Sequence, residues 1–345
     1  MKAYRIFADG MRFDEVPQPE PRDDEVLIEV AGCGACHSDL HVEGAAAAGK
    51  LPWQLPFTLG HEITGRIVAF AGKPPGFLSP GDAVAVYCAW GCGECAACKR
   101  GSDNYCERFR TLRGIGLGLD GGMASHVVVP SARYLVPLGD LDPIEAAPLA
   151  DAGITAYHAV ARSRRALGEG ATALVIGVGG LGHLGIQILH ALGGCRIVAL
   201  DLSDEKLALA RELGADAALR SDDPGILERV REAAGGRSAD IVLDFVGVQS
   251  TMDIARKSVR PDGEVALVGL GGGAVPVRQL SVPYGARFSI PFYGSIEDLR
   301  ETLALAAAGR IKAHVTRYAL DDVAHAFTAM RAGTLEGRAV ICPGG

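Results

Sequence analysis

A glycine-rich segment between two apolar stretches constrains the fold of this 345-residue chain more than any other feature. It follows the apolar run 172–176 and precedes a helical pattern over 181–192, so it is expected to join a strand to a helix. Its glycines permit a tight turn and let backbone N–H groups approach a pyrophosphate. The segment predicts a dinucleotide site, and a glycine-rich packing turn is the alternative. The candidate nucleotide-binding residues are Gly177, Gly179, Gly180, Leu181 and Gly182.

The residues that follow continue the alternation of strands and helices. Apolar runs at 197–200, 241–243 and 265–268 alternate with helical patterns near 203–213 and 249–259. Uninterrupted apolar strands between helices are typical of a parallel sheet that is covered on both faces. The sequence therefore predicts an α/β, doubly wound Rossmann domain.

A carboxylate stands where the nucleotide's ribose is expected. Asp201 lies nineteen residues after Gly182, at the end of an apolar run. In this position a carboxylate accepts hydrogen bonds from both hydroxyls of the adenosine ribose and repels a 2′-phosphate. The predicted cofactor is therefore NAD rather than NADP. The alternative is that Asp201 is an ordinary N-cap for the helix that begins near Ser203.

The amino-terminal part of the chain has a different pattern. Short β-rich runs separated by turn residues lie at 26–30, 63–70, 83–87 and 126–129. This pattern indicates an irregular, mostly antiparallel β domain. The length of the chain also favours two domains, because it exceeds the size at which a single core stops growing.

The carboxyl-terminal part is too short for a third domain. After Pro291 the sequence predicts helices at 295–308 and 320–331 and a last strand at 338–342. We expect these elements to join one of the first two domains.

Charge and composition narrow the classes of partner. The net charge of −7 argues against the broad basic face of a nucleic-acid-binding protein, so small ligands are the expected partners. The amino terminus lacks the apolar run of a secretory signal, and no apolar stretch is long enough to span a membrane. We therefore expect a cytoplasmic protein without a membrane partner. In a reducing compartment, its nine cysteines indicate metal or thiol chemistry.

Four closely spaced cysteines form the clearest metal signature. The pattern Cys92-x2-Cys95-x2-Cys98-x7-Cys106 places four thiols within fifteen residues. Such spacing matches a closed tetrahedral zinc site, which stabilises a loop and leaves no open position for catalysis. An iron–sulfur cluster and four unrelated buried cysteines are the alternatives.

Two further segments concentrate possible metal ligands. They are 34–41, Gly-Ala-Cys-His-Ser-Asp-Leu-His, and 60–62, Gly-His-Glu. A catalytic zinc needs about three protein ligands and an open position, so its ligands can come from distant segments. With these motifs, the four-cysteine loop, the glycine motif and the Gly-Arg at 337–338, the chain resembles the zinc-dependent medium-chain alcohol dehydrogenases along its whole length. It resembles in particular the bacterial NAD-dependent secondary alcohol dehydrogenases.

The resemblance implies a fold and a domain organisation. It implies an irregular β-rich, GroES-like catalytic zinc domain over 1–152 and 292–345, and an NAD-binding Rossmann domain over 153–291. It also implies two zinc ions per chain, one catalytic and one structural, and a homodimer or homotetramer.

The resemblance also implies the ligands of the catalytic zinc. Cys36 and His61 match two of them, and Asp39 matches the carboxylate that fixes the tautomer of the histidine. The usual third ligand is a cysteine, but this chain has Asp151 there, which preserves the charge of the site. Glu62 is the competing oxygen ligand.

Several other positions match functional residues of the family. Ser38 matches the hydroxyl that accepts the substrate's proton, and His41 matches the histidine that passes it to solvent; a local backbone hydrogen bonder and a surface imidazole are the alternatives. Thr155 matches a residue packed on the nicotinamide ring. The other implied cofactor contacts are Lys206 with the ribose, Arg338 with the pyrophosphate, and Val268. For both charged residues, a plain solvated charge is the alternative.

The family pattern also places two aromatic side chains and leaves one cysteine without a role. Trp53 and Tyr293 match aromatic residues of the substrate pocket, with a core position as the alternative. Cys33 forms a C-x2-C pair with Cys36, but the family has no role for it, so we expect a packed free thiol.

The implied reaction is a reversible hydride transfer between NAD and a small secondary alcohol or ketone, with zinc as Lewis acid. A polyol or primary alcohol dehydrogenase of the same family is the first alternative. A non-catalytic nucleotide-binding protein is the second, because the fold alone does not establish a function.

Overall fold

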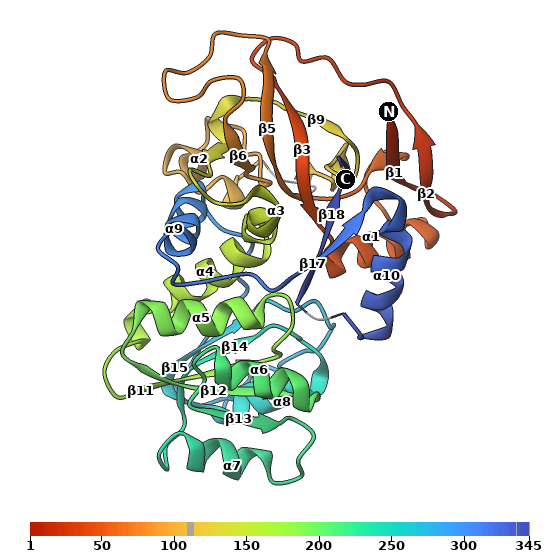
Figure 1. The fold of residues 1–345 in the computed structure, drawn as a ribbon. Coiled ribbons are helices and arrows are strands. Elements are labelled where there is room, and N and C mark those ends of the chain that lie inside the picture. The colour runs from red at the N-terminus through yellow and green to blue at the C-terminus, as the bar shows by residue number, and fades with distance from the viewer. Residues whose placement is uncertain (109–113, 336, 345) are drawn as a thin grey trace. The chain divides into compact units, whose positions relative to one another are not determined.

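The computed structural model describes residues 1–108, 114–335 and 337–344 (Figure 1). The chain divides into two compact units. Unit 1 comprises Met1–Ile154, Ser295–Ala307 and Ala313–Gly345, and unit 2 comprises Thr155–Gly294 and Ala308–Lys312. The sequence placed the divisions after residues 152 and 291, and it did not assign 308–312 to the Rossmann part.

The main sheet of unit 1 is built around β3, which leads into the first predicted metal motif. β3 pairs antiparallel with β5, β9 and β18, and the strand order is β10-β6-β5-β3-β18-β17 with β9 beside β3. The bounds of these strands are β3 (Val26–Gly34), β5 (Glu62–Phe70), β6 (Ala83–Val86), β9 (His126–Val129), β10 (Leu135–Pro137), β17 (Val315–Ala319) and β18 (Arg338–Cys342). The predicted antiparallel β domain is present, and β17 was not foreseen.

The remaining strands of unit 1 form small sheets. β1 (Lys2–Phe7) lies between β2 (Gly10–Glu15) and β4 (Phe57–Thr58), both antiparallel to it, and β7 (Gly114–Ile115) pairs with β8 (Gly118–Leu119). The helices are α1 (His37–Ala47), α2 (Ala96–Lys99), α3 (Pro143–Ala146), α9 (Ile296–Ala307) and α10 (Val323–Ala332), with short 3₁₀ turns η1 (Asp103–Tyr105), η2 (Ala132–Tyr134), η3 (Ala147–Ala150) and η5 (Leu320–Asp322). The unit boundary falls within α4 (Ala152–Arg162).

Helix α1 carries the Cys-His-Ser-Asp motif and was not predicted. It presents no continuous apolar stripe, since Asp39, Val42 and Ala46 are its buried residues. Its start is instead fixed by hydrogen bonding: Oδ2 of Asp39 accepts the backbone N–H of Cys36 over 2.9 Å. A carboxylate at the third helical position that reaches back in this way satisfies an otherwise free backbone donor.

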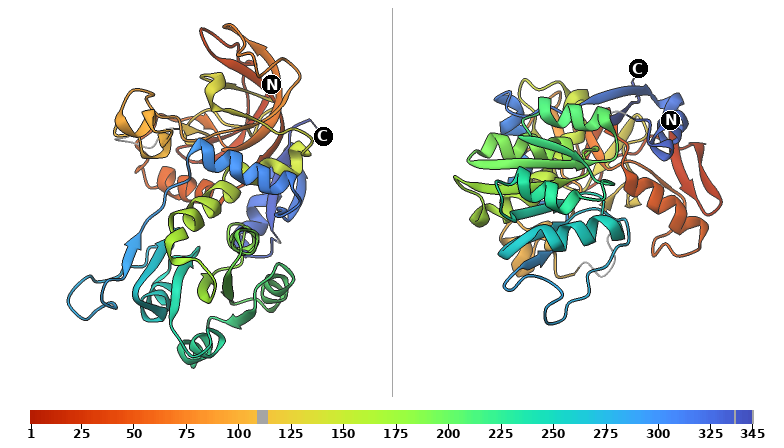
Figure 2. Two further views of the ribbon diagram at one scale, coloured as in Figure 1. Left: turned by 90° about the vertical axis from the view of Figure 1, so that its left-hand side faces the viewer. Right: turned by 90° about the horizontal axis from the view of Figure 1, so that it is seen from below.

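Unit 2 contains a parallel sheet in the order β13-β12-β11-β14-β15-β16 (Figure 2). This order reverses between β11 and β14, as in a doubly wound Rossmann sheet. The strands are β11 (Ala171–Ile176), β12 (Cys195–Asp201), β13 (Ala217–Arg220), β14 (Ala239–Asp244), β15 (Val259–Leu267) and β16 (Arg287–Ser289). The helices are α5 (Gly182–Leu192), α6 (Asp204–Glu212), α7 (Ile226–Ala233) and α8 (Gln249–Ser258), preceded by η4 (Arg164–Ala166).

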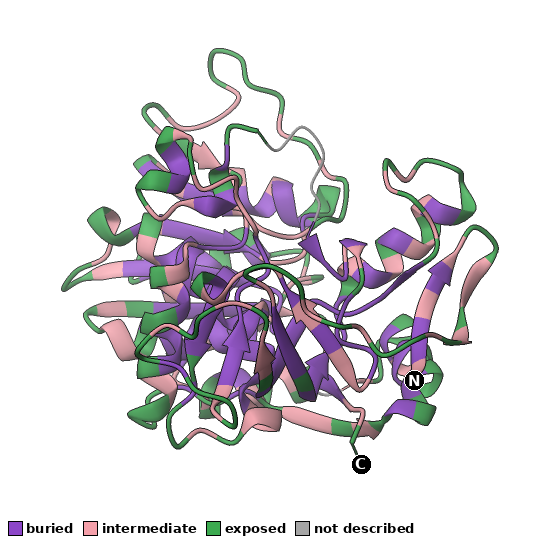
Figure 3. Cartoon of the chain, turned by 90° about the horizontal axis from the view of Figure 1, so that it is seen from above, coloured by how far each residue is buried: buried purple, intermediate pink, exposed green. Residues whose placement is uncertain are grey.

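The strands of unit 2 have continuous apolar sequences because their side chains are buried on both faces of the sheet. Side chains on one face of the sheet, such as Leu174 and Val198, form a buried cluster with α7 and α8. Side chains on the other face, such as Val175 and Ile197, are buried as well, and Figure 3 colours buried residues purple. Burial on both faces leaves no polar face to alternate with the apolar one. None of the helices in the described ranges is long and apolar enough to cross a membrane.

Candidate active site

The four predicted zinc thiolates lie together in unit 1. Cys92 and Cys95 precede α2, Cys98 lies within it, and Cys106 follows η1. All four sulfur atoms are within 4.8 Å of one another. The sulfurs of Cys95 and Cys98 are 3.4 Å apart, and those of Cys92 and Cys98 are 3.9 Å apart. A tetrahedral site with zinc–sulfur bonds of about 2.3 Å places its sulfurs about 3.8 Å apart, so this set fits zinc.

Backbone amides favour the ionised form of two of these thiols. The N–H of Cys98 donates to the sulfur of Cys95 and, with a second amide, lowers the pKa of Cys95 to about 6. Amides of the same loop lower the pKa of Cys92. Burial raises the pKa of Cys98 to about 12, and a bound zinc would ionise this thiol directly.

The ligands of the second cluster are brought together by the register of β3, β5 and β18. Gly34 in β3 pairs with Glu62 in β5 and with Val340 in β18. Cys36 follows the end of β3, and His61 precedes the start of β5, so both leave the sheet at the same edge. The backbone of β3 lies directly against the side chain of Glu62: a Cβ on Gly34 would lie 1.9 Å from Oε2 of Glu62, so a larger residue does not fit there.

Cys36, His61, Glu62 and Asp151 each offer one ligand atom, and these atoms lie within 4.8 Å of one another. Oδ2 of Asp151 is 3.5 Å from the sulfur of Cys36 and 3.6 Å from Nε2 of His61. Asp151 stands directly between η3 and α4. The structure thus gathers the predicted three ligands and the predicted competitor, and zinc coordination by them stays a prediction.

Two residues of α1 flank His61. Oδ1 of Asp39 lies 3.5 Å from Nδ1, and Oγ of Ser38 lies 3.2 Å from Nε2. The ring therefore turns Nδ1 toward a carboxylate and Nε2 toward the possible ligands. In metal sites this arrangement fixes the tautomer and orientation of a histidine.

Arg338 occupies a place that the sequence did not predict. Its Nε donates to Oε2 of Glu62 over 3.1 Å, its Nη2 also bonds Glu62, and Nη2 lies 3.3 Å from Oδ2 of Asp151. Arg338 and Glu62 are almost completely buried. The predicted contact of Arg338 with a pyrophosphate stays a prediction.

The electrostatics of the cluster favour a bound cation. Burial opposes a charge on His61, but the carboxylate of Asp39 and the bond to Asp151 outweigh it and raise the pKa of His61 well above its usual range. Burial alone would raise the pKa of Asp151, but His61 and Arg338 lower it below its usual range. A zinc ion would supply the positive charge that the ring otherwise takes from a proton. One thiolate, one imidazole and carboxylate oxygens are ligands that zinc accepts, so the residues fit this metal.

The glycine motif lies where the sequence placed it, between β11 and α5. Gly177 has φ +89°, and a Cβ on Gly182 would lie 1.7 Å from the carbonyl oxygen of Gly177. Asp201 ends β12, and its Oδ2 accepts the N–H of Val178 over 2.7 Å while Oδ1 accepts two further amides. Asp201 therefore braces the glycine turn; its ribose contact stays a prediction.

The other predicted residues are spread over both units. In unit 1, His41 is exposed on α1, and Trp53 packs edge-on against Phe57 with ring centroids 5.9 Å apart. Unit 2 holds Thr155 in α4 and Tyr293, both buried, and Lys206 in α6 and Val268 after β15, both half-buried. Their roles stay predictions.

Two buried cysteines lie near the second cluster, and the sequence analysis singled out only one of them. Cys33 is buried and outside the ligand set, as expected of a packed free thiol. Cys88 was not singled out by the sequence: burial raises its pKa to about 12, and charges on His61 and Asp151 act on it. Cys88 belongs to no local sequence motif, and only the fold brings it near the cluster.

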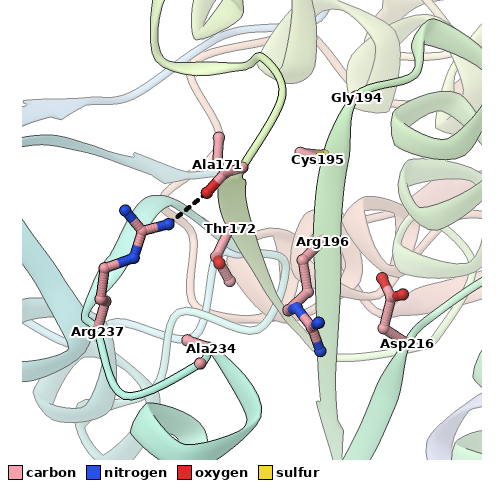
Figure 4. Close-up of a pocket in the computed structure, with 10 residues that line it drawn as sticks. Ala171, Thr172, Gly194, Cys195, Arg196, Asp216, Ala234 and Arg237 are labelled. Carbon is pink, nitrogen blue, oxygen red and sulfur yellow. Dashed lines mark hydrogen bonds between the residues drawn. The ribbon is translucent and has the colours of Figure 1, made fainter.

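A cavity of about 480 Å³ lies at the amino ends of β11 and β12, the end of the parallel sheet opposite to the glycine turn (Figure 4). Residues lining it include Thr172, Cys195, Arg196, Asp216 and Arg237. Ligands of doubly wound sheets bind at the carboxyl ends of the strands. The cavity contains none of the predicted site residues, and we do not assign the active site to it.

Known proteins agree with this arrangement over the whole chain. Residues 22–140 match the alcohol dehydrogenase GroES-like domain, and residues 180–308 match the zinc-binding dehydrogenase domain. A relative from Saccharolobus solfataricus, named D-arabinose 1-dehydrogenase (NADP(+)), is 35% identical and is aligned over 98% of this chain and 95% of its own. A relative from Sulfurisphaera tokodaii, named NAD-dependent alcohol dehydrogenase, is 33% identical over 99% of this chain and 100% of its own.

A solved structure shows the same fold. The alcohol dehydrogenase of the archaeon Aeropyrum pernix superposes with a TM-score of 0.91 at 35% identity, covering 99% of this chain and 100% of that one. Together with the two domain matches and the two metal clusters, this likeness identifies the chain as a member of the zinc-dependent medium-chain alcohol dehydrogenase family.

Proposed function

We propose that the protein is a zinc-dependent alcohol dehydrogenase and carbonyl reductase that transfers a hydride reversibly between NAD and a small secondary alcohol or ketone. The observation that carries this proposal is the second cluster, in which Cys36, His61 and Asp151 meet beside the hydroxyl of Ser38. A structural protein needs no such set of buried ligands with a hydroxyl against the histidine.

The roles of the residues follow from their places. When bound, zinc polarises the substrate's oxygen, and NAD exchanges the hydride. Ser38 is the group that accepts the substrate's proton, and exposed His41, three residues later on α1, passes it to solvent. Asp39 holds the tautomer of His61.

The nucleotide is expected at the carboxyl ends of the strands of unit 2. The glycine turn of residues 177–182 faces the pyrophosphate with backbone N–H groups, and Asp201 binds the ribose. Lys206, Val268 and Arg338 are the further contacts proposed by family pattern.

A second candidate function is oxidation of a polyol, sugar or primary alcohol. The relative named D-arabinose 1-dehydrogenase (NADP(+)), at 35% identity, favours this alternative. Initial rates with a matched panel of secondary alcohols, primary alcohols and polyols separate the candidates.

The direct test uses the purified, zinc-loaded protein with NAD and 2-propanol. We expect reduced nicotinamide to accumulate, about two zinc ions per chain, and a lower value of kcat/KM with primary alcohols and polyols. A chain that binds NAD but reduces none of it with any member of the panel would favour the non-catalytic nucleotide-binding alternative.

We also propose a homodimer or homotetramer in the cytoplasm. β16 is one of the two edge strands of the parallel sheet, and the segments before and after it carry exposed apolar side chains, namely Val277, Leu280, Tyr284 and Ile290. An edge of this kind is a common site of association between copies. The nine cysteines all lie in the described ranges and form no disulfide, which suits a reducing compartment. Light scattering measures the oligomeric state.

A further inference from the structure

The end of β13, next to the predicted ribose site, carries an arginine that two carboxylates surround. Arg220 is the register partner of Asp201 on the neighbouring parallel strand. Residues paired in this way project from the same face of a sheet, on strands about 4.8 Å apart. A backbone hydrogen bond joins the two strands just beyond this pair, since the N–H of Ser221 donates to the carbonyl oxygen of Asp201 over 3.0 Å.

The guanidinium of Arg220 is held by carboxylates on both sides. Its Nε and Nη2 donate to the two carboxylate oxygens of Asp222 over 3.0 and 2.9 Å, which is a bidentate pair. Its Nη1 donates to Oδ1 of Asp204 over 3.2 Å. These bonds raise the pKa of Arg220 and lower the pKa of Asp222. The three side chains together carry a net charge of −1.

A 2′-phosphate on the ribose would arrive at this place. In dinucleotide sites a carboxylate at the end of the second strand selects NAD, and an arginine close by accommodates the phosphate of NADP. This chain has both residue types, but each of the three guanidinium nitrogens of the arginine already donates to a carboxylate, which uses three of its five N–H donors. Arg220 is half-exposed, with 44% of its side chain accessible, so the phosphate would compete with Asp204 and Asp222 and not with a packed core.

We propose that Asp204 and Asp222 keep Arg220 from binding a 2′-phosphate, so that these two carboxylates, together with Asp201, set the preference for NAD. Arg220 is then a latent ligand for NADP. The proposal rests on the proposed nucleotide site at Asp201. It makes coenzyme preference a property of four side chains rather than of the ribose-binding carboxylate alone.

The test measures binding of 2′,5′-ADP and 5′-AMP by calorimetry, which needs no alcohol substrate. The starting variant is Asp201→Gly. We expect Asp201→Gly/Asp204→Asn/Asp222→Asn to bind 2′,5′-ADP about tenfold more tightly than Asp201→Gly, because charged hydrogen bonds become available. 5′-AMP should bind both variants within about twofold. The gain should shrink as salt is added.

Two further variants identify the residue responsible. Adding Arg220→Gln to the triple variant should remove the gain. Asp201→Gly/Asp253→Asn, which breaks a comparable ion pair with Arg256 on α8, should behave as Asp201→Gly. The ratio of kcat/KM with NADP to that with NAD should follow the same order in the active enzyme.

The contrary outcomes are distinct. Equal affinity of the single and triple variants for 2′,5′-ADP, or a gain that survives Arg220→Gln, would overturn the proposal. If these variants still bind 5′-AMP, the assignment of the nucleotide site stands. A wild-type chain that binds neither 5′-AMP nor NAD would overturn the nucleotide site and this proposal together.

Discussion

Arg338 and Glu62 are 276 residues apart in the sequence, and the Nε of Arg338 donates to Oε2 of Glu62 over 3.1 Å in the interior of unit 1. Burial raises the pKa of Glu62 to about 7 although the charge of Arg338 opposes the rise. The pair places a permanent positive charge beside two possible zinc ligands, Glu62 and Asp151. It also holds Glu62 by its two oxygens, which favours Asp151 as the third ligand.

Removing only one partner of this pair should be costly. We expect Arg338→Met to lower the apparent free energy of unfolding by about 3–5 kcal/mol, because it leaves a buried carboxylate without its partner. Arg338→Met/Glu62→Gln should recover most of that loss. Urea unfolding of the zinc-loaded proteins measures both, with Arg300→Met as a control that breaks an exposed pair with Glu297. A double variant no more stable than Arg338→Met would contradict this account of the pair.

The four-cysteine site should be structural and separable from catalysis. Cys106→Ser should remove about one zinc per chain and lower the Tm, because the free energy of metal binding is also free energy of folding. Metal analysis and calorimetry measure the two effects. Cys195→Ser, which changes a thiol outside both clusters, is the control. A Cys106→Ser protein with unchanged zinc content would end this assignment.

Much of the nucleotide site could be predicted, because its parts are close in the sequence. The glycine turn, its flanking strand and helix, and Asp201 all fall within 171–201, and the local sequence pattern predicts each of them. The four cysteines are local in the same way. The strands β13 and β16 were missed because runs of four and three residues are too short to show a period. The helix α7 was missed although its buried Ile226 and Val230 have the spacing of one helical face.

The second metal cluster shows where sequence reasoning stops. Its ligands were named through a family resemblance, and their proximity depends on the pairing of β3 with β5 and on the turn at Asp151. Arg338, which was expected to contact a pyrophosphate, lies against Glu62, a contact that the sequence did not predict. No local pattern predicts a contact over 276 residues, because the register of β18 on β3 creates it.

The exposed histidine of α1 should act in proton transfer to solvent. We expect His41→Gln to lower kcat for alcohol oxidation by about tenfold or more, since a positioned acid–base group is lost. Because His41 is exposed, added imidazole should partly restore the rate. His325→Gln, at another exposed histidine, should leave the rate unchanged. An equal rate in His41→Gln and wild type at every buffer concentration would remove His41 from the reaction.

Asp244, at the end of β14, should make stability depend on pH. Burial raises the pKa of Asp244 even though the N–H groups of Gly247 and Val246 donate to it. A carboxyl with a raised folded-state pKa contributes stability below its unfolded pKa and loses it as pH rises through the folded pKa. Asp244→Asn should therefore gain in Tm relative to wild type between about pH 4 and neutral pH.

Asp253 provides a control for the sign of this effect, because its pKa is shifted in the opposite direction. Arg256 lowers the pKa of Asp253, so Asp253→Asn should lose in Tm relative to wild type as pH rises through the acid range. Calorimetric scans over a pH series compare the three proteins. A wild-type protein that gains stability over Asp244→Asn with rising pH would contradict the assignment.

The central claim is that Asp151 is the third ligand of the catalytic zinc, where most relatives are expected to use a cysteine. Its Oδ2 lies 3.5 Å from the sulfur of Cys36 and 3.6 Å from Nε2 of His61. Asp151→Asn replaces an anionic oxygen with a neutral amide and should weaken retention of this zinc. Glu62 can substitute only by leaving Arg338 and taking the position that substrate needs.

The most direct measurement is zinc content per chain, determined together with kcat/KM, for Asp151→Asn and Asp151→Asn/Glu62→Gln. We predict a fall of at least about a hundredfold in kcat/KM for the single variant, because its Lewis-acid site is impaired. The double variant should keep about one zinc in place of about two, with the four-cysteine site and the fold intact. An Asp151→Asn protein with full zinc content and near-normal turnover would show that Asp151 only precedes α4 and that the third ligand lies elsewhere.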